Sequence, residues 1–141
     1  MIEDEAQHFV GKIAQKAIIE YQDKFLVCRP TKDSLWEFPG GRLNNEGTPY
    51  ENLEREVTEE LSICIKNIRA LHVIFSLHVK SNTKRILIGY HAYADTDICI
   101  LDKDEVEEIR WISKEELKAI ALFDDCREIA DYFLETELKI K

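Results

Sequence analysis

One stretch near the middle of the chain carries the signals of a helix with two different faces. Thr48 suits the N-cap, Pro49 the first helical position, and Glu51 follows the cap by three residues. In this pattern the side chains of Thr48 and Glu51 bond backbone N–H groups that the helix cannot pair itself. The helical period then places an apolar stripe, Tyr50, Leu53, Val57 and Leu61, beside an acidic stripe, Glu56, Glu59 and Glu60. We therefore predict a helix that packs by one face and presents three carboxylates from another.

The three adjacent carboxylates have two explanations. On an exposed helix each like-charged pair costs only about 0.2–0.5 kcal/mol, so a solvated acidic face is one of them. In a partly buried cleft, two charges about 5 Å apart repel by roughly 3 kcal/mol at an effective dielectric near 20, and the cluster then needs a cation. Carboxylate oxygens suit hard divalent ions, Mg²⁺ or Mn²⁺ before Zn²⁺. The second explanation makes Glu56, Glu59 and Glu60 metal ligands.

The residues just before this helix predict a loop that binds phosphate. Residues 35–38, LWEF, are expected to form a short strand that Pro39 ends. Gly40 and Gly41 then allow a sharp turn and a close approach of the backbone to a ligand. The guanidinium of Arg42 is a planar set of donors that suits phosphate oxygens. An ordinary Pro-Gly turn is the alternative, but loop and carboxylate helix together describe a place where a phosphate chain meets metal ions.

This stretch resembles the signature of the Nudix hydrolases. The signature reads Gly, five residues, Glu, seven residues, then Arg-Glu-aliphatic-any-Glu-Glu-any-Gly-aliphatic. The positions that match in register are Gly41, Arg55, Glu56, Val57, Glu59, Glu60 and Ile63. The preceding run WEFPGG resembles the MutT-like branch of the family. The resemblance extends over nearly the whole chain, and its specific part lies between Trp36 and Ile63.

Two positions depart from the signature. Gly47 stands where the first Glu belongs, and Glu46 lies one residue earlier, so that Glu46 either fills the same role from a shifted loop or the role is lost. Ser62 stands where a Gly belongs near the end of the helix. A non-glycine residue in the left-handed conformation costs roughly 1–2 kcal/mol, so we expect this helix to end differently or to carry strain. Both departures concern the efficiency of the site more than its identity.

The resemblance implies an α/β fold, an α/β/α sandwich around a mixed β-sheet. It also implies hydrolysis of a phosphoanhydride bond in a nucleoside diphosphate derivative, with Mg²⁺ or Mn²⁺ as the cofactor. Glu59 or Glu105 would take the proton from the attacking water, and Arg55 would orient the glutamates. Glu105 is the first candidate, and Glu108 the second, for the further carboxylate that the family supplies from outside the helix; an acidic surface loop is the alternative.

The resemblance leaves the substrate open. Gly40, Gly41 and Arg42 would position the phosphates, and Arg29 and Lys32 are further candidates, with solvated loop charges as the alternative. A (d)NTP pyrophosphohydrolase of the MutT type is the first prediction, because of WEFPGG. An ADP-ribose or nucleotide-sugar pyrophosphatase is the second. The third is a weakened Nudix domain that binds a nucleotide as a regulatory module, which Gly47 and Ser62 keep open.

Length and charge limit the remaining classes of function. The 141 residues suggest one domain, 1–141, with a loose arm over residues 1–11. A net charge of −9 disfavours a nucleic acid polymer or an anionic membrane as partner. The four cysteines show no metal-ligand spacing and the start of the chain no signal peptide, so we expect a cytoplasmic protein. The sequence leaves a homodimer open.

The rest of the chain predicts strands and two more helices. Residues 14–21 and 25–28 read as a hairpin with its turn at 22–24. Residues 70–79 and 85–94 alternate with period two and read as a second, antiparallel hairpin. A short strand is expected over Val106–Ile112. Ser113 and Glu116 repeat the capping pattern at the start of a further helix, and a last helix follows Asp124.

Overall fold

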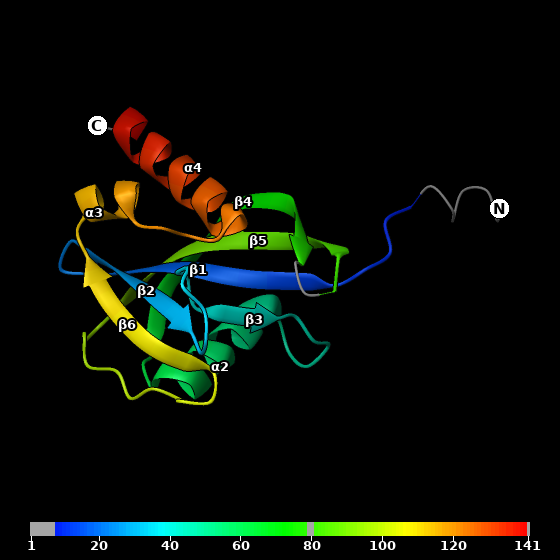
Figure 1. Ribbon diagram of the computed structural model, residues 1–141, viewed down its shortest axis with the longest axis horizontal. Helices are drawn as coiled ribbons and strands as arrows, with labels where there is room; N and C mark the ends of the chain where they lie inside the picture. Colours follow the sequence, from blue (N-terminus) through cyan, green and yellow to red (C-terminus); the bar gives the residue numbers. More distant parts are fainter. Residues whose placement is uncertain (1–7, 79–80, 141) are drawn as a thin grey trace.

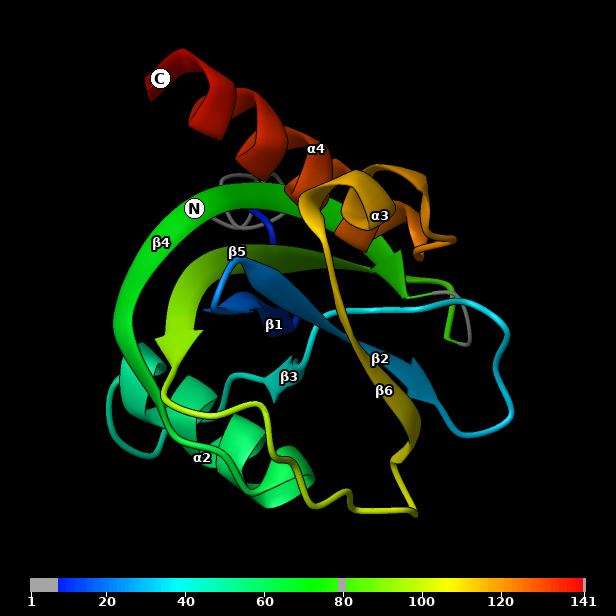
Figure 2. The same ribbon diagram turned by 90° about the vertical axis from the view of Figure 1, so that its left-hand side faces the viewer.

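The computed structural model of the protein describes residues 8–78 and 81–140 and has three layers. A sheet lies between α2 (Pro49–Leu61) on one face and α3 (Lys114–Ala119) with α4 (Asp124–Ile140) on the other, as Figures 1 and 2 show. The strands are β1 (Ile13–Tyr21), β2 (Lys24–Pro30), β3 (Gly40–Arg42), β4 (Ile65–His78), β5 (Thr83–Ala94) and β6 (Val106–Ile112). The predicted α/β/α sandwich is confirmed.

The sheet is mixed, as the resemblance implies. Its strand order is β4-β5-β1-β2-β6, and β3 pairs with β1 beside that path. β1 and β5 are parallel, in register from Ile13 opposite Ile86 to Glu20 opposite Tyr93. The other pairs of the sheet are antiparallel, including the two predicted hairpins β1–β2 and β4–β5. β1 is therefore the strand against which three others are aligned.

β1 and β2 separate soon after their turn. Gln22 and Asp23 have φ of 47° and 62°, the left-handed pair that a two-residue hairpin turn requires. Beyond the register pairs Glu20–Phe25 and Tyr21–Lys24, β2 pairs with β6 instead. Lys24 thus belongs to a strand and not to the turn, and β2 continues through Pro30. The divergence leaves an opening in the sheet on the α2 and β3 side.

The segment that fills this opening corrects one prediction. Residues 35–38 do not form a named strand; they contribute isolated bridges, Cys28 with Glu37 and Trp36 with Leu122. The strand lies further along the chain, at Gly40–Arg42, where Gly40 pairs with Lys16. A Cβ atom at Gly40 would lie 1.9 Å from the backbone oxygen of Gln15, so only glycine fits there. The glycines serve close strand pairing, which periodicity alone does not reveal.

Two apolar clusters hold the layers together, one on each face of the sheet. The predicted apolar stripe of α2 anchors the helix, because Leu53, Val57 and Leu61 are fully buried there. Burial of each such side chain contributes about 1.5–3 kcal/mol. On the other face α4 packs through a second cluster that includes Ile129 and Phe133. α2 is thereby fixed firmly enough to hold its acidic side at a constant distance from β1 and β3.

β4 is longer than predicted and presents an apolar row to solvent. It begins at Ile65 rather than near residue 70, and residue 79, the expected end, lies outside the described residues. Val73, Phe75 and Leu77 are 58%, 58% and 55% exposed. The ring of Phe9, in the predicted N-terminal arm, lies 5.4 Å from that of Phe75; residues 1–7 of the arm are outside the described ranges.

The helices of the described ranges are short or amphipathic. None of them is both long and apolar enough to cross a membrane.

Candidate functional site

The helix α2 begins and ends as its sequence requires. Glu51 N donates to Thr48 Oγ1 at 3.2 Å and Thr48 N donates to Glu51 Oε1 at 2.9 Å, which confirms the predicted capping box. At the other end Ser62 is left-handed, with φ 55° and ψ 37°, and its N–H donates to Thr58 O. The backbone therefore adopts the conformation that the Gly of the signature would favour, and Ser62 carries the strain that we expected as one outcome.

A buried asparagine ties α2 to the loop before it. Asn52 Nδ2 donates to Glu46 O at 2.7 Å and to Thr48 O at 3.0 Å. Its Oδ1 accepts from Asn44 N at 3.2 Å and from Arg55 Nη2 at 3.0 Å. Asn52 was not among the predicted site residues, although a polar residue beside the apolar stripe of an amphipathic helix is a signal that could have found it. Asn52 thus fixes both the loop that precedes α2 and the side chain of Arg55.

The same loop contains Glu46 and Gly47, the glutamate and glycine that depart from the order of the signature. Gly47 has φ +74°, which suits glycine, and the Glu46 side chain is exposed. Glu46 N donates to Asn44 Oδ1 at 2.9 Å, which makes it part of a local turn.

Glu56 lies directly against the predicted glycine loop. A Cβ atom at Gly41 would be 2.7 Å from Glu56 Oε2, so the absence of a side chain at Gly41 makes room for this carboxylate. Burial raises the pKa of Glu56, and the charges of Glu59 and Glu105 raise it further, whereas Arg55 opposes the rise. The structure thus brings together the glycine and the glutamate that the signature places fifteen positions apart.

Glu60 is the deepest of the three predicted metal ligands. Burial raises its pKa to about 8. The nearby cation Lys16 lowers this pKa, while the carboxylates of Glu37, Glu105 and Glu56 raise it. Among the described residues, no group donates a hydrogen bond to the carboxylate of Glu56 or Glu60. The acidic side of α2 therefore gathers negative charge in a partly buried place where protein donors do not balance it.

Glu59 and Glu105 border this place from the solvent side. The Glu59 side chain is 62% exposed, and its Oε1 lies 4.0 Å from Arg55 Nε. Glu105 lies in the exposed loop before β6, whose Asp102 N–H donates to Glu60 O at 2.9 Å and so docks the loop on the end of α2. The field of Glu105 reaches both Glu56 and Glu60. The predicted further carboxylate is accordingly near the helix.

Two residues of the site escaped sequence reasoning. Lys16 Nζ and Glu37 Oε1 form an ion pair at 3.2 Å, in the opening between β1 and β2. Glu37 belongs to the run WEFPGG, and its backbone pairs with Cys28. Lys16 interrupts the otherwise largely apolar run IAQKAII, and this interruption is the signal that could have found it. We define the carboxylate cluster as Glu37, Glu56, Glu60 and Glu105, with Lys16 as its cation.

Arg29, one of the predicted phosphate-binding arginines, is bound to other protein groups. Arg29 Nη1 donates to Asp33 O at 3.0 Å, and Arg29 Nη2 pairs with Glu108 Oε1 at 3.2 Å. Glu108, the second candidate carboxylate, is thus bound to an arginine, which lowers its pKa. Lys32 is exposed.

Arg42 stands opposite Ala14 on β3 and opens on a small basic hollow of about 100 Å³. The residues that line the hollow are Lys12, Ala14, Arg42, Ser81, Thr83 and Arg85. Arg85 Nη2 is paired with Asp125 Oδ2 of α4 at 3.3 Å, on the face of the sheet away from α2. Arg42 is therefore held at the edge of the opening between the two faces.

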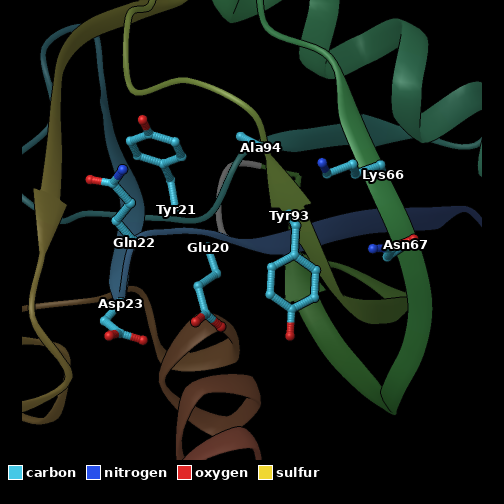
Figure 3. A pocket seen from close by; sticks show the side chains of 8 residues that line it. All are labelled: Glu20, Tyr21, Gln22, Asp23, Lys66, Asn67, Tyr93 and Ala94. Atoms are coloured by element: carbon cyan, nitrogen blue, oxygen red, sulfur yellow. The ribbon is translucent and has the colours of Figure 1, made fainter.

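The small hollow lies near the start of β1, and a larger hollow lies near the end of this strand, at Glu20 and Tyr21. Its volume is about 340 Å³, and Figure 3 shows its lining by Glu20, Tyr21, Gln22, Asp23, Lys66, Asn67, Tyr93 and Ala94. It is formed where the β1–β2 turn meets the ends of β4 and β5. No residue of the carboxylate cluster lines it.

The donor set of the carboxylate cluster fits a divalent metal ion. Its oxygens are the ligands that Mg²⁺ and Mn²⁺ prefer, and the raised pKa values of Glu56 and Glu60 mark a place where added positive charge is favourable. In the described ranges, no three Asp, Glu, His or Cys side chains already surround one point closely enough to hold an ion. The observation that supports a metal is therefore the charge of the cluster and not a finished coordination sphere.

Comparison with known proteins agrees with this site. The family profile described as "NUDIX domain" matches residues 14–133. An 8-oxo-dGTP diphosphatase of Proteus vulgaris is 34% identical over 58 residues; the match covers 39% of this chain and about half, 52%, of that relative.

Two solved structures show the likeness in fold. A MutT NUDIX hydrolase from Burkholderia pseudomallei has a TM-score of 0.75 at 19% identity, over 86% of this chain and 96% of that one. The NUDIX domain of Shewanella oneidensis NrtR, solved with ADP ribose, has a TM-score of 0.75 at 16% identity, over 96% and 97%. The family match covers most of the chain and includes every residue of the carboxylate cluster, so this chain belongs to the Nudix hydrolase family and is MutT-like.

Proposed function

We propose that the protein hydrolyses a phosphoanhydride bond in a nucleoside diphosphate derivative, with Mg²⁺ or Mn²⁺ held by Glu56, Glu59 and Glu60. The observation that carries this proposal is the concentration of negative charge beside Gly41, where Glu56 and Glu60 are without hydrogen-bond donors among the described residues. A divalent ion supplies the missing positive charge. When bound, it neutralises phosphate oxygens and lowers the pKa of a coordinated water.

The chain's own residues have separate tasks in this proposal. Glu56, Glu59 and Glu60 hold the metal, and α2 keeps them on one side through its buried stripe. Glu59 or Glu105, both exposed, accepts the proton of the attacking water at a carboxylate oxygen. Arg55, fixed by Asn52, orients Glu59.

The phosphates of the substrate would lie along β3, the strand of Gly40, Gly41 and Arg42. Gly40 and Gly41 have no side chains there, so the backbone stays accessible beside Glu56. Arg42, at the exposed end of β3, is the proposed donor to phosphate oxygens. Arg29 would reach substrate only by exchanging its bond to Glu108 for one to phosphate.

The first candidate substrates are nucleoside triphosphates or deoxynucleoside triphosphates. The run WEFPGG and the likeness to an 8-oxo-dGTP diphosphatase support this class. ADP-ribose or a nucleotide sugar is the second candidate, supported by the likeness in fold to the NrtR domain solved with ADP ribose. Gly47 and the strained Ser62 support the third, a domain that binds nucleotide with little turnover.

A nucleotide panel separates the three. Purified protein is incubated with Mg²⁺ and each of several candidate nucleotides in turn, and the products are separated by chromatography. Each nucleotide is used at concentrations about tenfold above and about tenfold below a typical KM. Release of pyrophosphate from a triphosphate supports the first candidate, and formation of two monophosphates supports the second. Binding by calorimetry without product supports the third. Hydrolysis that persists in EDTA would contradict the metal-dependent mechanism.

The setting of the protein is part of the same proposal. We expect the cytoplasm, because the free cysteines, of which Cys28 and Cys126 are buried, are typical of a reducing compartment. A small nucleotide is the expected partner, and a homodimer stays a prediction that light scattering would test.

A further inference from the structure

Lys16 has an unusual position for a lysine. It lies in the first half of β1, opposite Gly40, and its side chain is only 12% exposed. Its Nζ pairs with Glu37 Oε1 at 3.2 Å. Lysines are rarely buried without a partner that compensates the charge. The ion pair with Glu37 therefore compensates the buried charge of Lys16.

Its influence extends beyond Glu37. Lys16 lies near enough to lower the pKa of both Glu56 and Glu60, and Glu60 in turn stabilises the Lys16 ammonium. Lys16 and Glu37 stand on β1 and on the segment between β2 and β3, whereas Glu56 and Glu60 stand on α2. The charge of the Lys16 ammonium on the sheet therefore acts on carboxylates that stand on α2.

We propose that Lys16 is a positioning residue, a permanent counter-cation that holds Glu37 beside Glu60 and limits the affinity of the carboxylate cluster for divalent metal. The inference rests on the proposed function only in that the ion is the one the hydrolase would use. In this role Lys16 takes no direct part in the chemical step. It acts through the carboxylates, by occupying the inner side of the cluster with a positive charge of its own.

The proposal predicts opposite effects for the two members of the ion pair. Lys16→Met removes the charge and keeps a similar stem, so the cluster becomes more negative and binds Mn²⁺ more tightly. Even at the dielectric of water, one unit charge about 6 Å from a divalent ion changes its affinity about tenfold. Glu37→Gln removes a negative charge and should weaken Mn²⁺ binding by a similar factor. The double variant removes both charges and should return close to the wild-type affinity.

Mn²⁺ titration of the nucleotide-free protein, followed by electron paramagnetic resonance, is the measurement. Lys16→Arg keeps the charge and should leave the affinity within about twofold of wild type. Lys24→Met is the matched control, because Lys24 is an exposed lysine at the far end of the same hairpin, opposite Tyr21. Circular dichroism and the melting temperature of each variant identify those that fail to fold, and for these Lys16→Arg and the double variant carry the test.

The outcomes either support the inference or overturn it. Tighter Mn²⁺ binding in Lys16→Met with weaker binding in Glu37→Gln supports it. If both single variants bind Mn²⁺ more weakly, Lys16 serves only to shape the site, and the inference is wrong. Unchanged affinity in all variants overturns it as well.

Failure of the inference is distinguishable from failure of the proposed function. If wild type hydrolyses none of the nucleotides but the opposite shifts in Mn²⁺ affinity are observed, the hydrolase proposal fails and the role of Lys16 stands. If wild type is active and the shifts are absent, only the role of Lys16 falls. In the active enzyme the Mg²⁺ concentration for half-maximal rate should fall in Lys16→Met, which a purely structural loss would not produce.

Discussion

Two polar clusters occupy opposite ends of β1, and they differ in how completely their charges are paired. At the Glu20 end, His91 is 1% exposed, and its Nε2 lies 3.0 Å from Glu20 Oε1. Its Nδ1 lies 3.0 Å from Arg69 Nη2, and Arg69 pairs with Glu137 at 3.6 Å. Because Arg69 can only donate, Nδ1 must accept, which leaves Nε2–H to donate to Glu20.

The carboxylate cluster at the Lys16 end lacks this closure. Glu56 and Glu60 receive no hydrogen bond within the described residues, and Lys16 is bound to Glu37. A buried network whose atoms are all paired specifies a packing arrangement. An excess of like charge at a partly buried place costs stability and persists where function requires it. We therefore infer a structural role for the His91 network and a catalytic role for the carboxylate cluster.

The largest expected effect is on turnover at the carboxylate end. Glu60→Gln, Glu56→Gln and Glu59→Gln should each lower kcat by about 100-fold or more, since metal-ion stabilisation of the transition state is worth several kcal/mol. Glu54→Gln is the matched control, because Glu54 is exposed on the same helix. Steady-state rates with Mg²⁺ measure the effect. Full activity in Glu56→Gln, Glu59→Gln and Glu60→Gln would contradict a catalytic role for these glutamates.

The next effect concerns the pH dependence of stability without metal. The folded Glu60 keeps its proton up to a pKa of about 8, whereas the unfolded chain releases it above about 4.5. The folded state therefore binds more protons between these values, and the free energy of unfolding should fall as pH rises through this window, by about 5 kcal/mol in total.

Urea unfolding in EDTA at several pH values between 5 and 8 measures this slope. Glu60→Gln should flatten it and make the metal-free protein more stable at pH 8, and Mg²⁺ should stabilise wild type most at high pH. A wild-type slope equal to that of Glu60→Gln would mean that burial does not raise the pKa of Glu60.

The paired end of β1 should respond in the opposite direction. Burial lowers the pKa of His91 to about 4, so the unfolded state takes up a proton as pH falls below about 6.5 and the folded state does so only near 4. The free energy of unfolding should decrease over this window by about 3 kcal/mol. The measurement is best made in the Glu60→Gln background, where the opposite slope is absent.

His91→Gln should remove this acid sensitivity and leave kcat at pH 7 within about twofold. His72→Gln is the control, since His72 is only partly buried against Tyr132. A large loss of kcat in His91→Gln would show that the two ends of β1 are coupled and that the division between them is wrong.

The smallest effect tests the strain at the end of α2. Ser62→Gly should raise the free energy of unfolding by about 1 kcal/mol, because glycine adopts a φ of 55° without steric cost. Ser62→Ala keeps the Cβ atom and should not gain this stability. The urea midpoint measures both, and equal midpoints would show that the carboxylate helix ends without strain.

Local signals predicted the elements that carry the site. The caps at Thr48 and Ser113 depend on hydrogen bonds between residues a few positions apart, and both lie where their patterns indicated. The turn predicted over residues 22–24 is also local, and it comprises Gln22 and Asp23 without Lys24. The strand at residues 35–38 was wrong for the converse reason. Its apolar pattern is local, but the position of the strand was decided by the contact of Gly40 with Gln15, twenty-five positions away.

That three glutamates project from one side of a capped helix follows from the amino-acid sequence, because helical period and capping are short-range. Which of them is buried, that Gly41 makes room for Glu56, and that Lys16 and Glu37 join the cluster became known from the fold. Burial and charge pairing depend on where β1 and β2 diverge. That divergence is a property of the whole sheet, which no window of neighbouring residues contains.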